Sequence, residues 1–315
     1  MADLKIFSGN TNPIFANRVA EAAGVQMGKA KFSRFADGEV QVEIHESVRG
    51  CNVFVIQSTC PPVNESYMEL FMILDALKRA SANEITAVIP YYGYARQDRK
   101  VAPRAPISAK CIANLLNSAG ADRVLSVDLH SAQIQGFFNG PVDHLFGIPS
   151  LAQAFEKHYG AGEEFVTVSP DAGGVERCRA FAKRVKSPIA IIDKRRTGPN
   201  EAKALHIVGD VRDKTAIIVD DMIDTAGTLT QAVDSLVKNG AKRVFAVATH
   251  PVLSGPAVSR LAESPVEKVI VTDTIPLSEA AVQCGKFEVV SVAPVVAEAI
   301  LRINSHGSVS ALFDV

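Results

Sequence analysis

Residues 215–230, TAIIVDDMIDTAGTLT, decide the fold of this chain. The run 216–219 is short, apolar and rich in β-branched residues, which is typical of a strand buried on both faces of a parallel sheet. Asp220 and Asp221 end this run, and apolar residues at helical spacing begin again at Leu229. The pattern predicts a central strand that leads through a polar loop into a helix, which is where open α/β sheets bind ligands.

The loop between this strand and this helix has the composition of a phosphate-binding site. The backbone N–H groups of residues 225–228 open the helix and point toward an anion, with the helix dipole assisting. The hydroxyls of Thr225 and Thr228 add possible donors. The loop has no lysine, so it is not the GxxxxGK[ST] loop of nucleoside triphosphatases. Alanine disfavours a positive φ angle, so we expect Ala226 not to need one.

Three aspartates beside a phosphate loop need a reason, because like charges repel each other. The simplest reason is a ligand that carries both a phosphate and vicinal hydroxyls, such as ribose 5-phosphate. In that interpretation Asp220 and Asp221 accept hydrogen bonds from the hydroxyls, and Asp224 belongs to the phosphate loop. The alternative is that the two neighbouring acids only end a strand. The complete strand–loop–helix pattern favours the ligand.

Composition sets the class of protein. The 315 residues suggest about two domains, and 47% hydrophobic with 21% charged residues is ordinary for a chain with real cores. A net charge of −1 argues against general nucleic-acid or membrane-surface binding. Neither a signal peptide nor an apolar run of about 18 residues is present. The five cysteines form no CxxC pair, which indicates reduced thiols and a cytoplasmic location.

Five further stretches carry polar residues beside predicted strands or turns. They are FADGE at 35–39, YYGYARQDRK at 91–100, DLH at 128–130, SPDAGGVER at 169–177 and DKRRTGPNE at 193–201. Each has a plain structural interpretation, respectively a hairpin turn, a solvated basic loop, a hydrogen-bonded loop histidine, a tight turn and a solvated cationic surface. Four of them follow strands of a predicted parallel sheet, where ligand-binding residues gather.

VDDMIDTAGT closely resembles the ribose-5-phosphate-binding loop of the phosphoribosyltransferase-like fold. Together with the five other motifs, which stand in the same order, the chain resembles the ribose-phosphate diphosphokinases over nearly its whole length. The resemblance implies an α/β protein of two similar domains, each a parallel-sheet phosphoribosyltransferase-like fold flanked by helices, with the active site between them. A self-match of GADRVLSVDLH (120–130) with GAKRVFAVATH (240–250) also favours two related halves.

The resemblance implies the following domain boundaries. The N-terminal domain, with the ATP-binding motifs, spans residues 1–143 and takes up the helix at about 293–305. The C-terminal domain, with the ribose-5-phosphate loop, spans 144–292 and the tail 306–315. Residues 133–143 are expected to form the boundary region.

The resemblance also implies an activity, namely transfer of the diphosphoryl group of Mg·ATP to the C1 hydroxyl of ribose 5-phosphate. The products are 5-phosphoribosyl 1-diphosphate, which feeds nucleotide biosynthesis, and AMP. Two alternatives stay open at this point. One is a nucleobase phosphoribosyltransferase, and the other is a non-catalytic regulatory relative.

Residue roles follow from the resemblance, motif by motif. The implied catalytic cations are Lys194 and Arg196, on a loop that corresponds to the family's catalytic flexible loop. The implied ATP-binding residues are Phe35, Asp37, Gly38, Glu39, Arg96 and Gln97. The implied Mg²⁺ ligands are His130 and Asp171, although histidine is an atypical ligand for magnesium. The implied ribose-5-phosphate-binding residues are Arg196, Asp220, Asp221, Asp224, Thr225, Ala226, Gly227 and Thr228.

The resemblance finally implies assembly and regulation. Members of the family form hexamers built from dimers, so we expect a homo-oligomer, and we expect no nucleic-acid or membrane partner. A regulatory anion site between subunits is implied at Ser47, Arg49, Ser308 and Ser310. Inorganic phosphate is then the expected activator and ADP the expected inhibitor.

Overall fold

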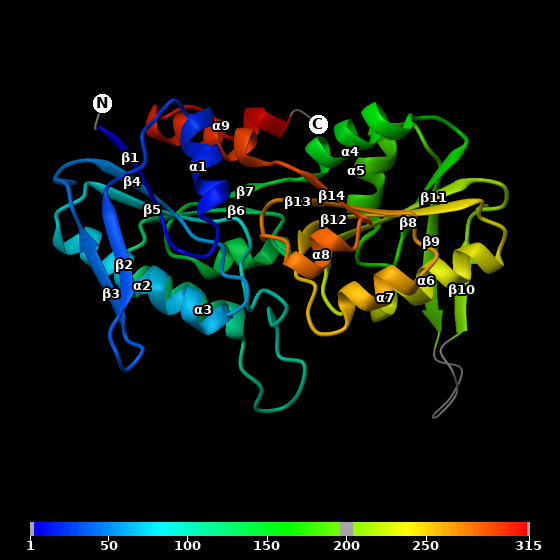
Figure 1. Cartoon of the computed structure of the whole chain (residues 1–315), viewed down its shortest axis with the longest axis horizontal. Helices are drawn as coiled ribbons and strands as arrows, with labels where there is room; N and C mark the ends of the chain where they lie inside the picture. The colour runs from blue at the N-terminus through cyan, green and yellow to red at the C-terminus, as the bar shows by residue number, and fades with distance from the viewer. Residues whose placement is uncertain (1–2, 196–203, 314–315) are drawn as a thin grey trace. The chain divides into compact units, whose positions relative to one another are not determined.

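The computed structural model describes residues 3–195 and 204–313, and Figure 1 traces its elements. The chain divides into two compact units. Unit 1 is Met1–Phe146 with Val292–Val315, and unit 2 is Gly147–Ser291. Each unit contains a mainly parallel sheet covered by helices, so the α/β fold class expected from the sequence is confirmed.

Unit 1 is built on a five-stranded sheet in the order β1-β4-β5-β6-β7, in which all neighbouring strands run parallel. The strands are β1 (Leu4–Ser8), β4 (Asn52–Ile56), β5 (Glu84–Ile89), β6 (Arg123–Val127) and β7 (Val142–Leu145). A separate antiparallel hairpin pairs β2 (Ala30–Arg34) with β3 (Val40–Ile44). The residues that join these two strands include the FADGE turn.

Helices cover both faces of the unit 1 sheet (Figure 1). They are α1 (Pro13–Ala22), α2 (Val63–Arg79), α3 (Ser108–Ala119), α9 (Ala293–Asn304) and the short 3₁₀ helices η1 (Ala132–Phe137) and η2 (Ser310–Phe313). Val53 and Val55 of β4 pack with α2 and α3, whereas Phe54 and Ile56 pack with α1 and α9. Because alternate side chains of a strand point to opposite faces, this double burial explains the continuous apolar runs in the sequence.

Unit 2 is built on a seven-stranded sheet in the order β10-β9-β8-β11-β12-β13-β14. Its edge pair β9 and β10 is antiparallel, and the other pairs are parallel. The strands are β8 (Phe165–Ser169), β9 (Ile189–Arg195), β10 (Ala204–Val208), β11 (Thr215–Ile223), β12 (Arg243–Pro251), β13 (Lys268–Thr272) and β14 (Phe287–Val290). The strand that contains the two aspartates, β11, is therefore the central one.

Two layers of helices bury the unit 2 sheet. The helices are α4 (Ile148–Tyr159), α5 (Val175–Val185), α6 (Gly227–Lys238), α7 (Ala257–Glu263) and α8 (Glu279–Gln283). Ile217 and Val219 of β11 pack with residues of α4 and α5, whereas Ala216 and Ile218 pack with residues of α6 and α7. The central strand is thus buried on both faces over residues 216–219, as this apolar run predicts.

Two segments differ from the sequence-based expectations. Residues 133–143, expected to be a boundary region, contain most of η1 and the start of β7, which is the edge strand of the unit 1 sheet. The tail 306–315 was expected with the C-terminal domain, but its described residues belong to unit 1. In unit 1 the ring centroid of Phe313 lies 5.3 Å from that of Phe146, an aromatic contact that the sequence pattern does not predict.

None of the helices in the described residues combines the length and the apolar character of a membrane span.

Candidate active site

The two acids of the deciding stretch lie inside β11 and not after it. The sequence pattern predicts that the strand stops at residue 219, but β11 continues to Ile223, and Asp220 is paired with Ala248 of β12. The extension arises because β12 is equally long and supplies backbone partners for the extra residues.

Arg177 provides the positive charge that these acids need. Its Nη1 lies 3.7 Å from Oδ1 of Asp220 and 3.8 Å from Oδ1 of Asp221, and it comes from the first turn of α5. No role was expected for Arg177 from the sequence. Its position directly after SPDAGGVE was the feature of the sequence that could have indicated a role.

One arginine does not fully compensate two adjacent carboxylates. The Asp221 side chain is only 7% exposed and that of Asp220 is 36% exposed. Burial and the neighbouring charge of Asp221 raise the pKa of Asp220 to about 8, although Arg177 acts in the opposite direction. Near neutral pH the pair therefore holds a proton.

The phosphate loop, residues 224–228, leads from β11 into α6. Thr225 and Thr228 are exposed, Asp224 and Gly227 are half-buried, and Ala226 is buried. Helix α6 begins at Gly227, so the first N–H groups of this helix have no acceptor within it. The loop and the two acids are continuous along the chain, which brings the expected sugar and phosphate contacts together in unit 2.

Ala226 corrects one expectation. It adopts φ 58° and ψ 2°, the left-handed conformation that we expected this position not to need. The left-handed region costs a residue with a Cβ roughly 1–2 kcal/mol. The loop therefore keeps its backbone path with alanine at this position, because packing of Ala226 in the core of α6 and α7 holds it there.

The SPDAGG turn forms a tight start to α5. The carboxylate oxygen Oδ1 of Asp171 accepts a hydrogen bond from Gly174 N (3.0 Å), and Ser169 Oγ donates to the carbonyl of Asp171 (2.7 Å). Asp171 is exposed. Its second carboxylate oxygen is thus on the surface at the end of β8, the neighbour of β11 in the sheet.

The FADGE turn lies at the tip of the β2–β3 hairpin in unit 1. Gly38 has φ 95°, which suits glycine, and Glu39 N donates to Oδ1 of Asp37 (3.1 Å). Asp37 and Glu39 are exposed, and Phe35 has 51% of its surface exposed. An aromatic ring and two acids are therefore free of core packing, as the predicted adenine-binding role requires.

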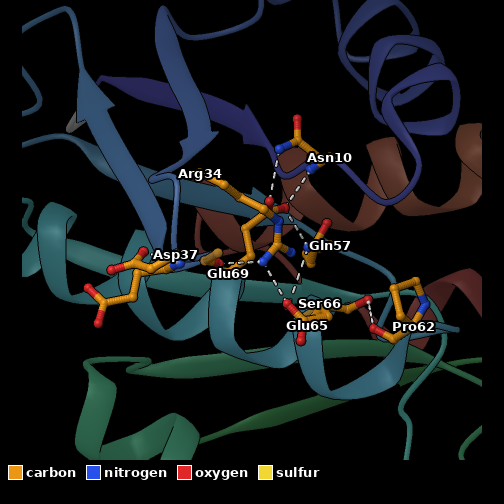
Figure 2. Close-up of polar contacts among 10 residues, drawn as sticks. Asn10, Arg34, Asp37, Gln57, Pro62, Glu65, Ser66 and Glu69 are labelled. Atoms are coloured by element: carbon orange, nitrogen blue, oxygen red, sulfur yellow. Dashed lines mark hydrogen bonds and ion pairs between the residues drawn. The ribbon is translucent and has the colours of Figure 1, made fainter.

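Arg34 fixes this turn to helix α2. Its Nη1 donates to the carbonyl of Gly38 (2.9 Å) and to Oε2 of Glu65 (2.6 Å), as Figure 2 shows. Beside this ion pair lies a polar cavity of about 240 Å³. In its wall Glu69, only 7% exposed, accepts hydrogen bonds from Asn10 N (2.7 Å) and from Gln57 Nε2 (2.8 Å).

The basic stretch after β5 forms an irregular surface segment, as its prolines and charges predict. Arg96 and Gln97 are exposed. Gln97 accepts a hydrogen bond from Ser108 Oγ at the start of α3, and its carbonyl accepts one from Ala109 N (3.2 Å). Gln97 is thus held by α3.

The DLH motif follows β6 at the same edge of the unit 1 sheet as the stretch after β5. His130 is exposed, whereas Asp128 is only 5% exposed and has φ 39°. Leu129 N donates to Nε2 of His144 (2.9 Å), so that ring nitrogen is an acceptor and carries no proton. The motif presents one imidazole to solvent beside a buried acid.

The donor set fits magnesium bound together with substrate. Mg²⁺ usually takes one or two protein carboxylates and completes its shell with waters and substrate phosphates. Within residues 3–195 and 204–313, no group of three or more His, Cys, Asp or Glu side chains forms a cage. The exposed side chain of Asp171 is instead an oxygen donor of the kind that this ion prefers, and His130, the other predicted ligand, is also exposed.

The predicted catalytic cations lie at the limit of the described residues. Lys194 is in β9, where its backbone pairs with that of Leu205 in β10. Arg196 lies outside the described residues, so its predicted catalytic and ribose-5-phosphate roles stay predictions.

The four predicted regulatory residues all belong to unit 1 and are exposed. Ser308 Oγ and Ser310 Oγ are 3.0 Å apart. Arg49 Nη1 donates to Ser81 Oγ (3.4 Å), and Ser47 lies two residues before Arg49. These contacts are hydrogen bonds on the surface and do not by themselves define an anion site.

A parallel sheet whose central strand carries two acids near its end and leads into a predicted phosphate loop is typical of the phosphoribosyltransferase-like α/β proteins. Residues 4–120 match the family model described as the N-terminal domain of ribose phosphate pyrophosphokinase. Residues 194–314 match the model of the phosphoribosyl synthetase-associated domain. The chain therefore belongs to the ribose-phosphate pyrophosphokinase family, which confirms the resemblance seen in the sequence.

Individual relatives agree with the family models. The chain is 56% identical over 312 residues to the ribose-phosphate pyrophosphokinase of Bacillus subtilis (strain 168), covering 99% of this chain and 97% of that protein. It is 57% identical over 311 residues to that of Caldanaerobacter subterraneus subsp. tengcongensis, covering 98% of each. The crystal structure of phosphoribosylpyrophosphate synthetase from Mycobacterium smegmatis matches with a TM-score of 0.91 and 45% identity, covering 97% of this chain and 100% of that one.

The raised pKa of Asp220 predicts how stability depends on pH. The folded protein holds a proton on Asp220 above the ordinary pKa of 3.8, whereas the unfolded chain releases it. Stability from this proton is therefore lost as the pH rises toward about 8. We expect Asp220→Asn, which cannot ionise, to raise the melting temperature relative to the unsubstituted protein more at about pH 8.5 than at about pH 5.

The control for this measurement is Asp213→Asn. Asp213 is an acid with a 75% exposed side chain near Lys242, and its carboxyl is not buried beside another acid. If thermal denaturation without ligand gives the same Asp220→Asn difference at both pH values, Asp220 does not carry the extra proton.

The left-handed conformation of Ala226 predicts an unusual tolerance of glycine. Ala226→Gly loses a buried methyl worth about 0.8 kcal/mol, but it relieves the roughly 1–2 kcal/mol of backbone strain. We expect the free energy of unfolding to stay within about 1 kcal/mol of that of the unsubstituted protein. Ala232→Gly, at a buried position inside α6, is the matched control and is expected to cost about 2 kcal/mol. Equal losses in urea denaturation would argue against strain at Ala226.

Proposed function

We propose that this chain transfers the β,γ-diphosphoryl group of Mg·ATP to the C1 hydroxyl of ribose 5-phosphate. The products are 5-phosphoribosyl 1-diphosphate and AMP, and the reaction belongs to nucleotide biosynthesis. The observation that carries the proposal is 53–57% identity, over nearly the full length of both chains, to proteins named ribose-phosphate pyrophosphokinase. Identity over both units favours this activity over that of a nucleobase phosphoribosyltransferase or of a regulatory relative.

In this proposal unit 2 holds ribose 5-phosphate. Asp220 and Asp221 bind the vicinal hydroxyls, and the proton shared by the pair allows one carboxyl to donate while the other accepts. The N–H groups of residues 225–228 and the hydroxyls of Thr225 and Thr228 bind the 5-phosphate. The same loop includes Asp224, Ala226 and Gly227, and the exposure of the two threonines supports their role.

The ATP-binding residues in this proposal belong to unit 1. Phe35 stacks on adenine, and Asp37 and Glu39 accept from its exocyclic amine at the Gly38 turn. Arg96 and Gln97 contribute from the segment after β5. The half-exposed ring of Phe35 and the exposed side chains of both acids support this assignment.

The chemistry is positioning and charge neutralisation. The C1 oxygen attacks the β-phosphorus while the hydroxyl proton passes to water, the bond from that phosphorus to the oxygen of AMP breaks, and AMP leaves with the electron pair. Lys194 and Arg196 stabilise the charge on the transferred group. Asp171 and His130 are the residues that would hold Mg²⁺, and the ion would supply further positive charge. Arg177 keeps the acid pair in place beside the sugar.

Assembly, location and regulation are part of the proposal. The chain acts in the cytoplasm as a homo-oligomer, a hexamer built from dimers. Inorganic phosphate activates it and ADP inhibits it through Ser47, Arg49, Ser308 and Ser310. The exposure of all four residues supports this, since an intersubunit anion site requires accessible side chains.

The reaction is tested by incubating the purified protein with Mg·ATP and ribose 5-phosphate and separating the nucleotides. We expect AMP to form in a one-to-one ratio with the sugar consumed, with no ADP from this step. Formation of ADP, or consumption of 5-phosphoribosyl 1-diphosphate together with a nucleobase, would show a different activity.

The role of Lys194 is tested by Lys194→Ala. We expect turnover to fall by roughly 10³ or more, by analogy with the cations that stabilise transferred phosphoryl groups. Binding of ribose 5-phosphate, measured by calorimetry, is expected to stay nearly unchanged because its predicted contacts are elsewhere. Lys242→Ala, which removes an exposed lysine, is the matched control. Turnover at the level of this control would remove Lys194 from the catalytic step.

A further inference from the structure

Three consecutive carbonyl oxygens at the end of β11 and in the phosphate loop accept hydrogen bonds from one segment, residues 253–260, which we call the carbonyl brace. The three bonds run from Leu253 N to Ile223 O (2.9 Å), from Ser254 N to Asp224 O (3.0 Å) and from Arg260 Nη1 to Thr225 O (3.0 Å). The next carbonyl, that of Ala226, accepts from Thr230 N (2.9 Å) within α6. Four carbonyls in a row thus have assigned donors.

This arrangement determines where the N–H groups of the loop point. In a trans peptide the C=O of one residue and the N–H of the next are antiparallel. Drawing the carbonyls of Ile223, Asp224 and Thr225 toward the carbonyl brace therefore turns the N–H groups of residues 224–226 to the opposite side. An anion bound on that side meets donors and no carbonyl oxygens.

The carbonyl brace itself is held in an uncommon conformation. Leu253 has φ 51°, in the left-handed region that a leucine seldom adopts. Such residues persist where the surroundings determine the backbone path, and they cluster at functional sites. The turn at Leu253 allows its own N–H and that of Ser254 to reach two successive carbonyls of the loop.

Arg260 differs from the other two donors because it brings a full charge. A Cβ built on Gly227, the first residue of α6, would lie 3.3 Å from Nη1 of Arg260. The guanidinium is therefore at the N-terminal end of α6, where the helix dipole disfavours a cation. A bound phosphate reverses this balance, since the dianion is attracted by both the guanidinium and the helix end.

We propose that Arg260 is a positioning residue for the sugar phosphate: by binding the Thr225 carbonyl it keeps the phosphate loop in its anion-binding conformation. This inference rests on the proposed function for the identity of the ligand. Arg260 acts through the loop, and its charge adds to the field at the phosphate position. A side chain at position 227 would lie in close contact with the same guanidinium.

The test compares Arg260→Ala and Arg260→Lys in the full-length protein, with AMP formation as the assay. We expect Arg260→Ala to raise the KM for ribose 5-phosphate at least about tenfold, as expected for loss of a charge-assisted hydrogen bond. The KM for ATP is expected to stay within about twofold, because the contact is in the phosphate loop. Arg260→Lys keeps a charged donor, and we expect it to recover most of the lost affinity.

A second readout does not depend on activity. Amide hydrogen exchange of the protein without substrate is expected to become faster at residues 223–228 in Arg260→Ala and to stay unchanged in the cores of both units. The matched control is Arg243→Ala, which removes an exposed arginine from the start of β12, where Arg243 pairs with Glu267. This control is expected to leave both KM values and the exchange of the loop unchanged.

These measurements test the role of Arg260 separately from the proposed function. An unchanged KM for ribose 5-phosphate, a parallel rise of both KM values, or a Lys variant as weak as the Ala variant would overturn it, as would unchanged exchange at 223–228. Absence of AMP formation by the unsubstituted protein would instead refute the proposed function. The exchange comparison would then still decide whether Arg260 holds the loop.

Discussion

The site depends on one constraint: two adjacent carboxylates at the end of a central strand that is buried on both faces. Asp220 and Asp221 extend a fully apolar run, and Asp221 is buried, so water reaches it little and the repulsion between the two carboxylates is less screened than in solution. Arg177 is close to both, and the remaining imbalance is visible in the raised pKa of Asp220. A buried acid pair of this kind is costly for stability alone, and it suits a ligand with hydroxyl donors or a cation.

Those parts of the structure that depend on the local sequence pattern could be predicted from the sequence. The apolar run 216–219 identified the central strand because both of its faces are buried, and FADGE was interpreted as a hairpin turn, which joins β2 and β3. The phosphate loop and the FADGE turn were also found at their places in the fold. Composition and periodicity report burial and turn chemistry directly, so these elements could be predicted.

The rest depends on contacts between segments that are distant in the sequence. The extension of β11 to Ile223 is set by its partner strand β12, and the conformation of Ala226 is set by packing in the core of unit 2. Arg260 has no distinctive sequence context, and Arg177 has only its place after SPDAGGVE, so the roles of both appear only when α5 and α7 are folded against the end of β11. The sequence shows that both residues are positively charged, but it does not show which groups they contact.

Stability and function draw on largely separate residues in this chain. The cores between sheets and helices contain apolar side chains such as Phe155, which contacts several aromatic rings and dominates the packing of α4. The candidate binding segments are held by polar contacts instead, such as the pair of Arg34 with Glu65, both of which are partly exposed. An exposed ion pair contributes only about 0–1 kcal/mol to stability. The effect of this ion pair is therefore to select one conformation of the hairpin tip, in which Phe35 stays exposed to solvent. Because stability and function depend on largely separate residues, the binding segments can change without unfolding of the sheets that carry them.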